Sequence, residues 1–336
     1  LYYYYKIKRT EIKKQRNHSK NCRHESAITT LKKILCVTIP MSLSSILSSL
    51  NKNIDSFTVV RGLSKIMSSE KAKIQYGILG GKVDTLVSFP LSFNMSFATV
   101  LVPAITWAIS RNDKKDAIKK IRFSIISSLI IALPCTIGMI VFSDQILNLL
   151  FPNASEGTLI LKLSSISIIF IMLEQTINGA LQGIGKLKVP AIALSIGVSI
   201  KLLINLLLVP ISIEKFFFGE VMGAVLGTVV CHIISFLIGF YILNKNIKLN
   251  IGYIKILKII ISSILMAVLS SKLYYVLTSI ISIKMATIIA IVVAVIVYIL
   301  AIIILRVFDK EEIISISVGK KIYSKLPKIL KYSNKL

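Results

Sequence analysis

Charged side chains inside long apolar stretches are the residues of this sequence best suited to chemistry. In one stretch Lys52 and Asp55 lie three positions apart, and Arg61 follows six positions later. Inserting a charge at the centre of a membrane costs about 2.5 to 3.5 kcal/mol, whereas a leucine or isoleucine returns only about 0.3 to 0.6 kcal/mol. These charges therefore need a partner, water or the interface. Lys52 and Asp55 are neighbours on a helix and could pair; Asp55 and Arg61 could line a cavity or reach the outer interface.

Two further polar stripes run at helical spacing through later apolar stretches. Lys201 and Asn205 are four positions apart, as are Glu174 and Asn178, so each pair lies along one helix face. Lys201 falls near the middle of its stretch, which predicts a wet cavity or an acidic partner, and Glu174 is the candidate counter-charge. Such a pair could either fix helix packing or take a direct part in transport, and the sequence leaves both open.

Catalytic and cofactor-binding patterns do not accompany these charges. The sequence has no phosphate-binding glycine loop, nucleophile elbow or zinc-binding helix motif. Its four cysteines and three histidines lack metal-ligand or redox spacing, and we interpret them as reduced thiols and as solvated or packed histidines. They are Cys22, Cys36, Cys135, Cys231, His18, His24 and His232. We therefore expect no catalytic residue, no metal site and no cofactor.

Composition places these residues in a membrane. Hydrophobic residues make up 54% of the 336 positions, yet 41 lysines and arginines face only 15 acidic residues. The basic residues form short clusters between apolar runs, without the aromatic interleaving of a nucleic-acid-binding surface, so nucleic acid is not expected as a partner. The runs are long enough for helices and lack the alternation of barrel strands. The predicted class is an all-α integral membrane protein.

Eight membrane-spanning helices are predicted from these runs. They lie near residues 34–60, 84–108, 121–143, 159–181, 189–212, 221–243, 256–280 and 285–308. The connections between the spans alternate in charge. Every second connection, counted together with the two ends of the chain, gives 30 basic residues in all. The remaining connections hold seven, five of them in 61–83. Because cytoplasmic loops carry the excess of lysine and arginine, both ends of the chain are predicted to be cytoplasmic.

The same pattern divides the chain into four parts. Residues 1–33 read as a basic cytoplasmic connector whose first residues, 1–5, resemble the end of a truncated upstream helix. A six-helix lobe is expected over 34–243, two additional transmembrane helices over 244–308 and a basic cytoplasmic tail over 309–336. The chain is thus expected to be a fragment of a longer protein.

Four stretches resemble the stage V sporulation protein B family. They are Asn53–Leu63 (NIDSFTVVRGL), Tyr76–Gly81 (YGILGG), Val102–Asp113 (VPAITWAISRND) and Leu181–Pro190 (LQGIGKLKVP). That family belongs to the multidrug, oligosaccharidyl-lipid and polysaccharide flippase superfamily and is similar to the lipid II flippases. The likeness runs from about residue 28 to 310.

The resemblance implies a flippase that moves polyprenyl-diphosphate-linked sugars outward by alternating access, in the cell membrane of a bacterium, for wall or spore-cortex synthesis. It implies that the chain is the C-terminal lobe plus a helix pair, with membrane lipids and an absent N-terminal lobe as partners. Lys52, Arg61 and Lys201 would then face the diphosphate. Alternatives are a cation-coupled multidrug exporter, which would favour acidic and aromatic cavity residues, and a membrane glycosyltransferase, which would need clustered carboxylates.

Overall fold

All regular structure in the described part of the chain is helical. The structure is a computed structural model that describes residues 26–152, 154–249 and 252–307. Its helices are α2 (Ala27–Leu63), α3 (Ser69–Gly77), the π-helix η2 (Ile78–Val83), α4 (Asp84–Ser110), α5 (Lys114–Val141), α6 (Ser143–Leu150), α7 (Thr158–Gly183), α8 (Lys188–Leu208), α9 (Val221–Asn246), α10 (Tyr253–Thr278) and α11 (Ile283–Ile304). This confirms the all-α membrane class.

Eight of these helices are long and apolar enough to cross a bilayer, as the sequence predicts. The second span differs in extent from the prediction. Residues 61–83 were expected to be a connection, but α3, η2 and α4 form one continuous helix, Ser69–Ser110. Within η2 the bonding changes register, because the amide of Asp84 donates to Leu79 O, five residues back. Such π-helical segments hold an extra residue per turn.

The chain divides into two compact units, Leu1–Ser42 and Leu43–Leu336. The described part of the first unit is residues 26–42, most of which form the first part of α2. Residues 27–33, which the sequence assigned to a connector, therefore belong to this helix. The remainder of that connector and the predicted tail 309–336 lie outside the described residues.

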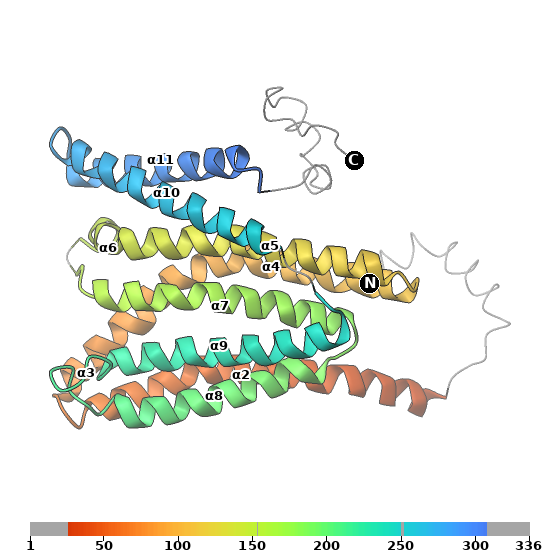
Figure 1. Cartoon of the computed structure of the whole chain (residues 1–336). Helices are drawn as coiled ribbons and strands as arrows, with labels where there is room; N and C mark the ends of the chain where they lie inside the picture. Colours follow the sequence, from red (N-terminus) through yellow and green to blue (C-terminus); the bar gives the residue numbers. More distant parts are fainter. Residues whose placement is uncertain (1–25, 153, 250–251, 308–336) are drawn as a thin grey trace, which may run out of the picture. The chain divides into compact units, whose positions relative to one another are not determined.

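The core of the second unit is built around α7. This helix packs against α4, α5 and α9, while α8 packs on α9, and the hairpin of α10 and α11 packs on α5 (Figure 1). Buried aliphatic side chains such as Ile121, Ile126 and Ile177 fill the space between them. In a membrane, contact between helices is stabilised by van der Waals packing and by hydrogen bonds. Polar residues on α7, α8 and α9 are buried between these helices.

Small residues allow α8 and α9 to approach closely. A Cβ on Gly197 would lie 2.7 Å from Cys231 O, and one on Gly227 would lie 2.6 Å from the side-chain oxygen of Asn205. Gly223 and Gly227 form a G-x-x-x-G pair on α9, a spacing typical of close helix contacts in membranes. The close approach places the polar side chains of α8 beside those of α9.

Candidate functional site

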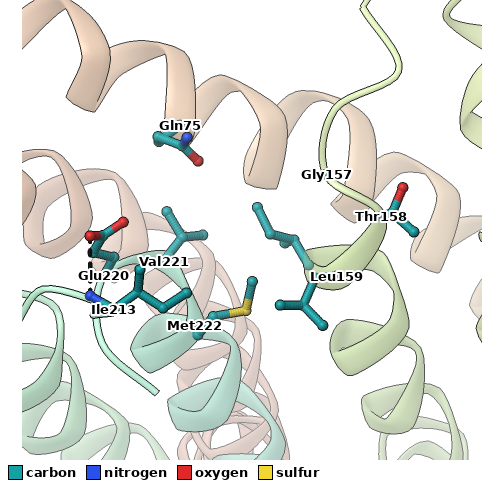
Figure 2. A pocket seen from close by; sticks show the side chains of 9 residues that line it. Gln75, Gly157, Thr158, Leu159, Ile213, Glu220, Val221 and Met222 are labelled. Carbon is teal, nitrogen blue, oxygen red and sulfur yellow. Dashed lines mark hydrogen bonds between the residues drawn. The ribbon is translucent and has the colours of Figure 1, made fainter. Parts of the chain in front are cut away.

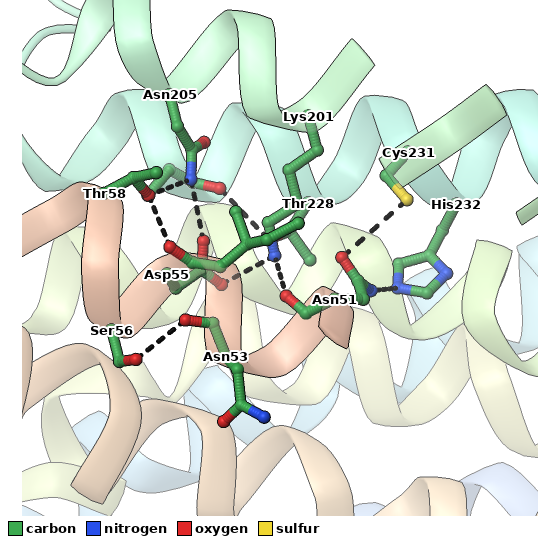
Figure 3. A network of polar contacts seen from close by, with 12 residues as sticks. Asn51, Asn53, Asp55, Ser56, Thr58, Lys201, Asn205, Thr228, Cys231 and His232 are labelled. Carbon is green, nitrogen blue, oxygen red and sulfur yellow. Dashed lines mark hydrogen bonds and ion pairs between the residues drawn. The ribbon is translucent and has the colours of Figure 1, made fainter. Parts of the chain in front are cut away.

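A buried ion pair joins α2 to α8. Lys201 Nζ lies 2.6 Å from Asp55 Oδ2, with side-chain exposures of 1% and 12%. The same ammonium donates to the main-chain oxygen of Asn51, at 2.9 Å. Figure 3 shows Lys201 reaching from its helix to Asp55 and Asn51. A charge removed from water is tolerated only with a partner and further hydrogen bonds, and this pair has both.

The second carboxylate oxygen of Asp55 is also bonded. Asn205 Nδ2 donates to Asp55 Oδ1 at 2.9 Å and to Thr58 Oγ1 at 2.9 Å. Thr58 in turn donates to Ile54 O, one turn earlier in α2. Lys201 and Asn205 are one turn apart on α8, so together they hold the carboxylate from two positions.

The predicted pairing of Glu174 with Lys201 is wrong. Glu174 Oε2 lies 2.6 Å from His232 Nδ1 on α9, and both side chains are largely buried. The two residues face different neighbouring helices: Glu174 is on α7, which packs against α9, whereas Lys201 points from α8 to α2. The suggested pairing of Lys52 with Asp55 is also wrong, since Asp55 faces Lys201 and Asn205 while Lys52 is exposed.

Asn51 connects the two buried pairs. Its Nδ2 lies 3.4 Å from His232 Nε2, and its Oδ1 accepts a long contact of 3.9 Å from the thiol of Cys231. Asn51, His232 and Cys231 were not among the predicted site residues. The signal was present, because Asn51, Asp55 and Thr58 follow the i, i+4, i+7 spacing of one helix face. Figure 3 shows Asn51 between Lys201 and His232.

The remaining predicted site residues lie outside this network. Lys52 and Arg61 are exposed, and Asn178 is half-buried. Lys52 and Arg61 are nine residues apart, which places them on opposite sides of α2. Lys52 shares its side of the helix with Ser45, Ser48 and Ser56. Arg61 belongs to the last turn of α2.

A cavity of about 230 Å³ lies where α7 and α9 begin (Figure 2). Its polar lining includes Gln75 of α3, Thr158 of α7 and Glu220, whose side chain accepts a hydrogen bond from the amide of Ile213. Glu220 has a positive φ of 54° just before α9. None of the predicted site residues lines this cavity.

Comparison with known proteins identifies the family. Residues 12–282 match the family model of the lipid II flippase MurJ. In Bacillus subtilis (strain 168), the uncharacterized membrane protein YabM is 33% identical over 202 residues, which is 59% of this chain and 38% of YabM. The lipid II flippase MurJ of that organism is 29% identical over 133 residues, 38% of this chain and 24% of MurJ. The sporulation protein YkvU is 27% identical over 158 residues, 47% of this chain and 35% of YkvU.

Solved structures show the same fold. A lipid II flippase MurJ in an inward closed conformation superposes with a TM-score of 0.58 at 22% identity, over 83% of this chain and 55% of that one. An outward-facing multidrug transporter of the same superfamily gives a TM-score of 0.51 at 18% identity, over 86% and 68% of the two chains. The chain spans well under half the length of the curated relatives that it matches. Since the family model covers most of its residues, this multi-pass membrane chain belongs to the lipid II flippase MurJ family.

Proposed function

We propose that this chain forms the C-terminal lobe of a flippase that moves a polyprenyl-diphosphate-linked sugar outward across the cell membrane of a bacterium. Membership of the lipid II flippase family supports the substrate class. In this proposal residues 34–243 form the lobe, α10 and α11 are an additional pair, and both ends of the chain are cytoplasmic. A second, N-terminal lobe completes the passage, and alternating access arises when the lobes rock against each other.

The observation that carries the proposal is an exposed cation within a membrane span. Lys52 lies well inside α2, is exposed, and shares its side of the helix with serine hydroxyls. Lipid would make that position costly, whereas a wet passage between two lobes would not. A diphosphate in such a passage is attracted by an ammonium group more strongly than in bulk water. Lys52 is therefore our first candidate for contact with the substrate.

The other proposed site residues have different places in this scheme. Lys201, Asp55 and Asn205 bond to one another across α2 and α8, so we assign them to holding the face of α2 that carries Lys52. Glu174 belongs to the pair with His232. Arg61 and Asn178 remain candidates for substrate contact away from Lys52.

The test uses the full-length protein that contains this chain, expressed in cells depleted of their own lipid II flippase. We expect outward movement of the lipid-linked wall precursor to be restored. Because a hydrogen bond to a charged group contributes about 1.5 to 3 kcal/mol, Lys52→Ala should lower the rate roughly tenfold or more, and Lys52→Arg should recover much of it.

Lys162→Ala is the matched control, because Lys162 is an exposed lysine of another span, α7. Its rate should equal that of the unmodified protein. Equal rates for Lys52→Ala and Lys162→Ala would remove Lys52 from the site. No movement of precursor by the unmodified, correctly inserted protein would remove the substrate class.

A further inference from the structure

The buried pair of His232 and Glu174 takes no part in the proposed contact with substrate. It bridges α9 and α7 in the interior of the second unit, with Nδ1 to Oε2 at 2.6 Å and side-chain exposures of 12% and 8%. Unlike lysine or arginine, histidine changes charge between about pH 5 and pH 8 when unperturbed. A histidine held by a carboxylate inside a membrane is therefore a place where a single proton can be bound or released.

Both nitrogens of the His232 ring have a polar partner. Asn51 turns its amide nitrogen, which can only donate, toward His232 Nε2 at 3.4 Å. In this amide orientation Nε2 accepts, whereas the opposite orientation would present the amide oxygen to an Nε2 that carries a hydrogen. Glu174 Oε2 lies 2.6 Å from the other ring nitrogen, Nδ1, and can accept a hydrogen bond from it. Figure 3 draws this contact between Asn51 and His232.

Charge balance favours taking up that proton. The charged and titratable groups bonded into this network are Asp55 of α2, Glu174 of α7, Lys201 of α8, and Cys231 and His232 of α9. The bonded partners Asn94 of α4 and Ser128 of α5 are neutral. Asp84 of α4 is a further titratable group, close enough to interact with the charges of Asp55, Lys201 and Lys52. Lys201 balances Asp55, which leaves the charge of Glu174 unbalanced while His232 is neutral. A proton on His232 would offset the charge of an ionised Glu174, and an unbalanced buried charge is costly.

Protonation would also change the contact between α9 and α2. A proton on Nε2 places two donors opposite each other, so the Asn51 amide must rotate and present Oδ1 to the ring. Oδ1 then leaves the thiol of Cys231. Asn51 also accepts the ammonium of Lys201 through its main-chain oxygen, so its movement reaches the ion pair that holds α2.

We propose that His232 and Glu174 form a proton-binding site in this lobe, and that Asn51 transmits its occupancy to α2. The ligand is a single proton, and the binding site itself requires no assumption about the substrate. Its use in the transport cycle rests on the proposed function. The proton would then be the ion whose binding alters the face of α2 that carries Lys52.

The binding site can be tested on the purified chain, because its sequence has only three histidines. With ¹⁵N-labelled histidine, the signals lost in His232→Gln identify His232. On acidification we expect its Nε2 to change from acceptor to donor. Glu174→Gln should move the midpoint of that change, and the control His24→Gln should leave it in place. A ring that stays neutral throughout, or an identical midpoint in Glu174→Gln, would overturn the proposal.

The transmission step needs a separate variant, Asn51→Leu, which keeps the pair but removes the amide. In the full-length protein, the pH dependence of precursor movement should disappear in His232→Gln and in Asn51→Leu, and persist in His24→Gln. If His232 binds a proton but Asn51→Leu retains the full pH dependence, transmission through Asn51 is wrong. If no precursor moves in any form while His232 still titrates, the proposed function fails and the proton site stands.

Discussion

At the scale of single residues, the buried cation of Lys201 is stable because its surroundings replace water almost completely. Asp55 provides the opposite charge, Asn51 a carbonyl and Asn205 a second donor to the carboxylate. The desolvation cost of two charges is several kcal/mol each, so the pair is favourable only while every partner is present. Removing one partner should therefore lower the stability of the protein more than removing both.

This asymmetry gives a prediction for the stability of the purified chain. Lys201→Met leaves Asp55 as an unpaired buried charge and should lower the free energy of unfolding by about 3 to 5 kcal/mol, as should Asp55→Leu. The double variant should lose much less than the sum of the two. Thermal unfolding in detergent measures these differences.

Lys162→Met provides the control for that experiment, since it removes an exposed lysine from a membrane span. We expect little change in its unfolding temperature. Additive losses in the double variant would mean that Lys201 and Asp55 do not stabilise each other.

The sequence pointed to most of these residues but misassigned their partners. A charge in an apolar run is visible from hydropathy and insertion energies alone. Which charge it meets depends on which helices pack together and how each is rotated, and neither follows from one helix. The spacing in the sequence suggests that Asp55 could pair with its neighbour Lys52, whereas its partner in the structure is 146 positions away in the chain.

At the scale of elements, α8 and α9 bring the network together because their backbones nearly touch. Gly197 meets Cys231 O, and Gly227 meets the Asn205 side chain and the backbone of Lys201. At Gly197 a methyl group would meet backbone and requires the helices to separate, whereas at Gly227 it requires the Asn205 side chain to move. The spacing of the network thus depends on two positions that carry no charge.

Alanine at Gly197 should push α8 and α9 apart, and alanine at Gly227 should displace the Asn205 side chain. We expect Gly197→Ala and Gly227→Ala each to lower stability by about 1 to 3 kcal/mol, the usual cost of overpacking. Gly227→Ala should also weaken the hold of Asn205 on Asp55. Thermal unfolding of the purified chain provides the measurement.

Gly81→Ala is the matched control, because no atom lies within 4 Å of the added methyl group. It should be neutral, or slightly stabilising because alanine favours helical backbone. A loss for Gly81→Ala as large as for Gly197→Ala would show that the cost arises from the helix itself and not from contact between helices.

Most helix ends were predictable to within about four residues, since each span needs roughly 20 apolar residues and each run shows them. The helices α2 and α5 begin seven residues before the predicted spans. A larger difference is the segment 61–83, where the five basic residues suggested a connection. In the structure much of it is helical, including Lys71 and Lys73 within α3. The number of basic residues in a segment therefore does not tell whether its backbone is helical.

At the scale of the whole molecule, an even number of spans predicts that the two ends of the described chain lie on one side of the membrane. The eight helices satisfy this by length and composition. The charge of the connections predicts that this side is the cytoplasm. Single cysteines in a background without the four native ones can test the orientation directly.

Two exposed positions at opposite ends of the spans suit this experiment. Ser282→Cys, between α10 and α11, should react with a membrane-impermeant maleimide added to intact cells, whereas Ser110→Cys, at the end of α4, should react only after permeabilisation. The reverse pattern would invert the chain in the membrane. Reaction of both in intact cells would contradict the number of crossings between them.

The extra residue of the π-helix η2 allows related proteins to differ in how α3 is rotated near Gln75. One residue fewer there would restore regular α-helical bonding, and each residue of an α-helix turns it by about 100°. Deleting Gly80 or Gly81 should therefore swivel α3 about its own axis, taking Ala72 out of the interior and Gln75 away from the cavity that it lines. The loss of a single codon would thus change the lining of that cavity while leaving every charged side chain of the interior in its place.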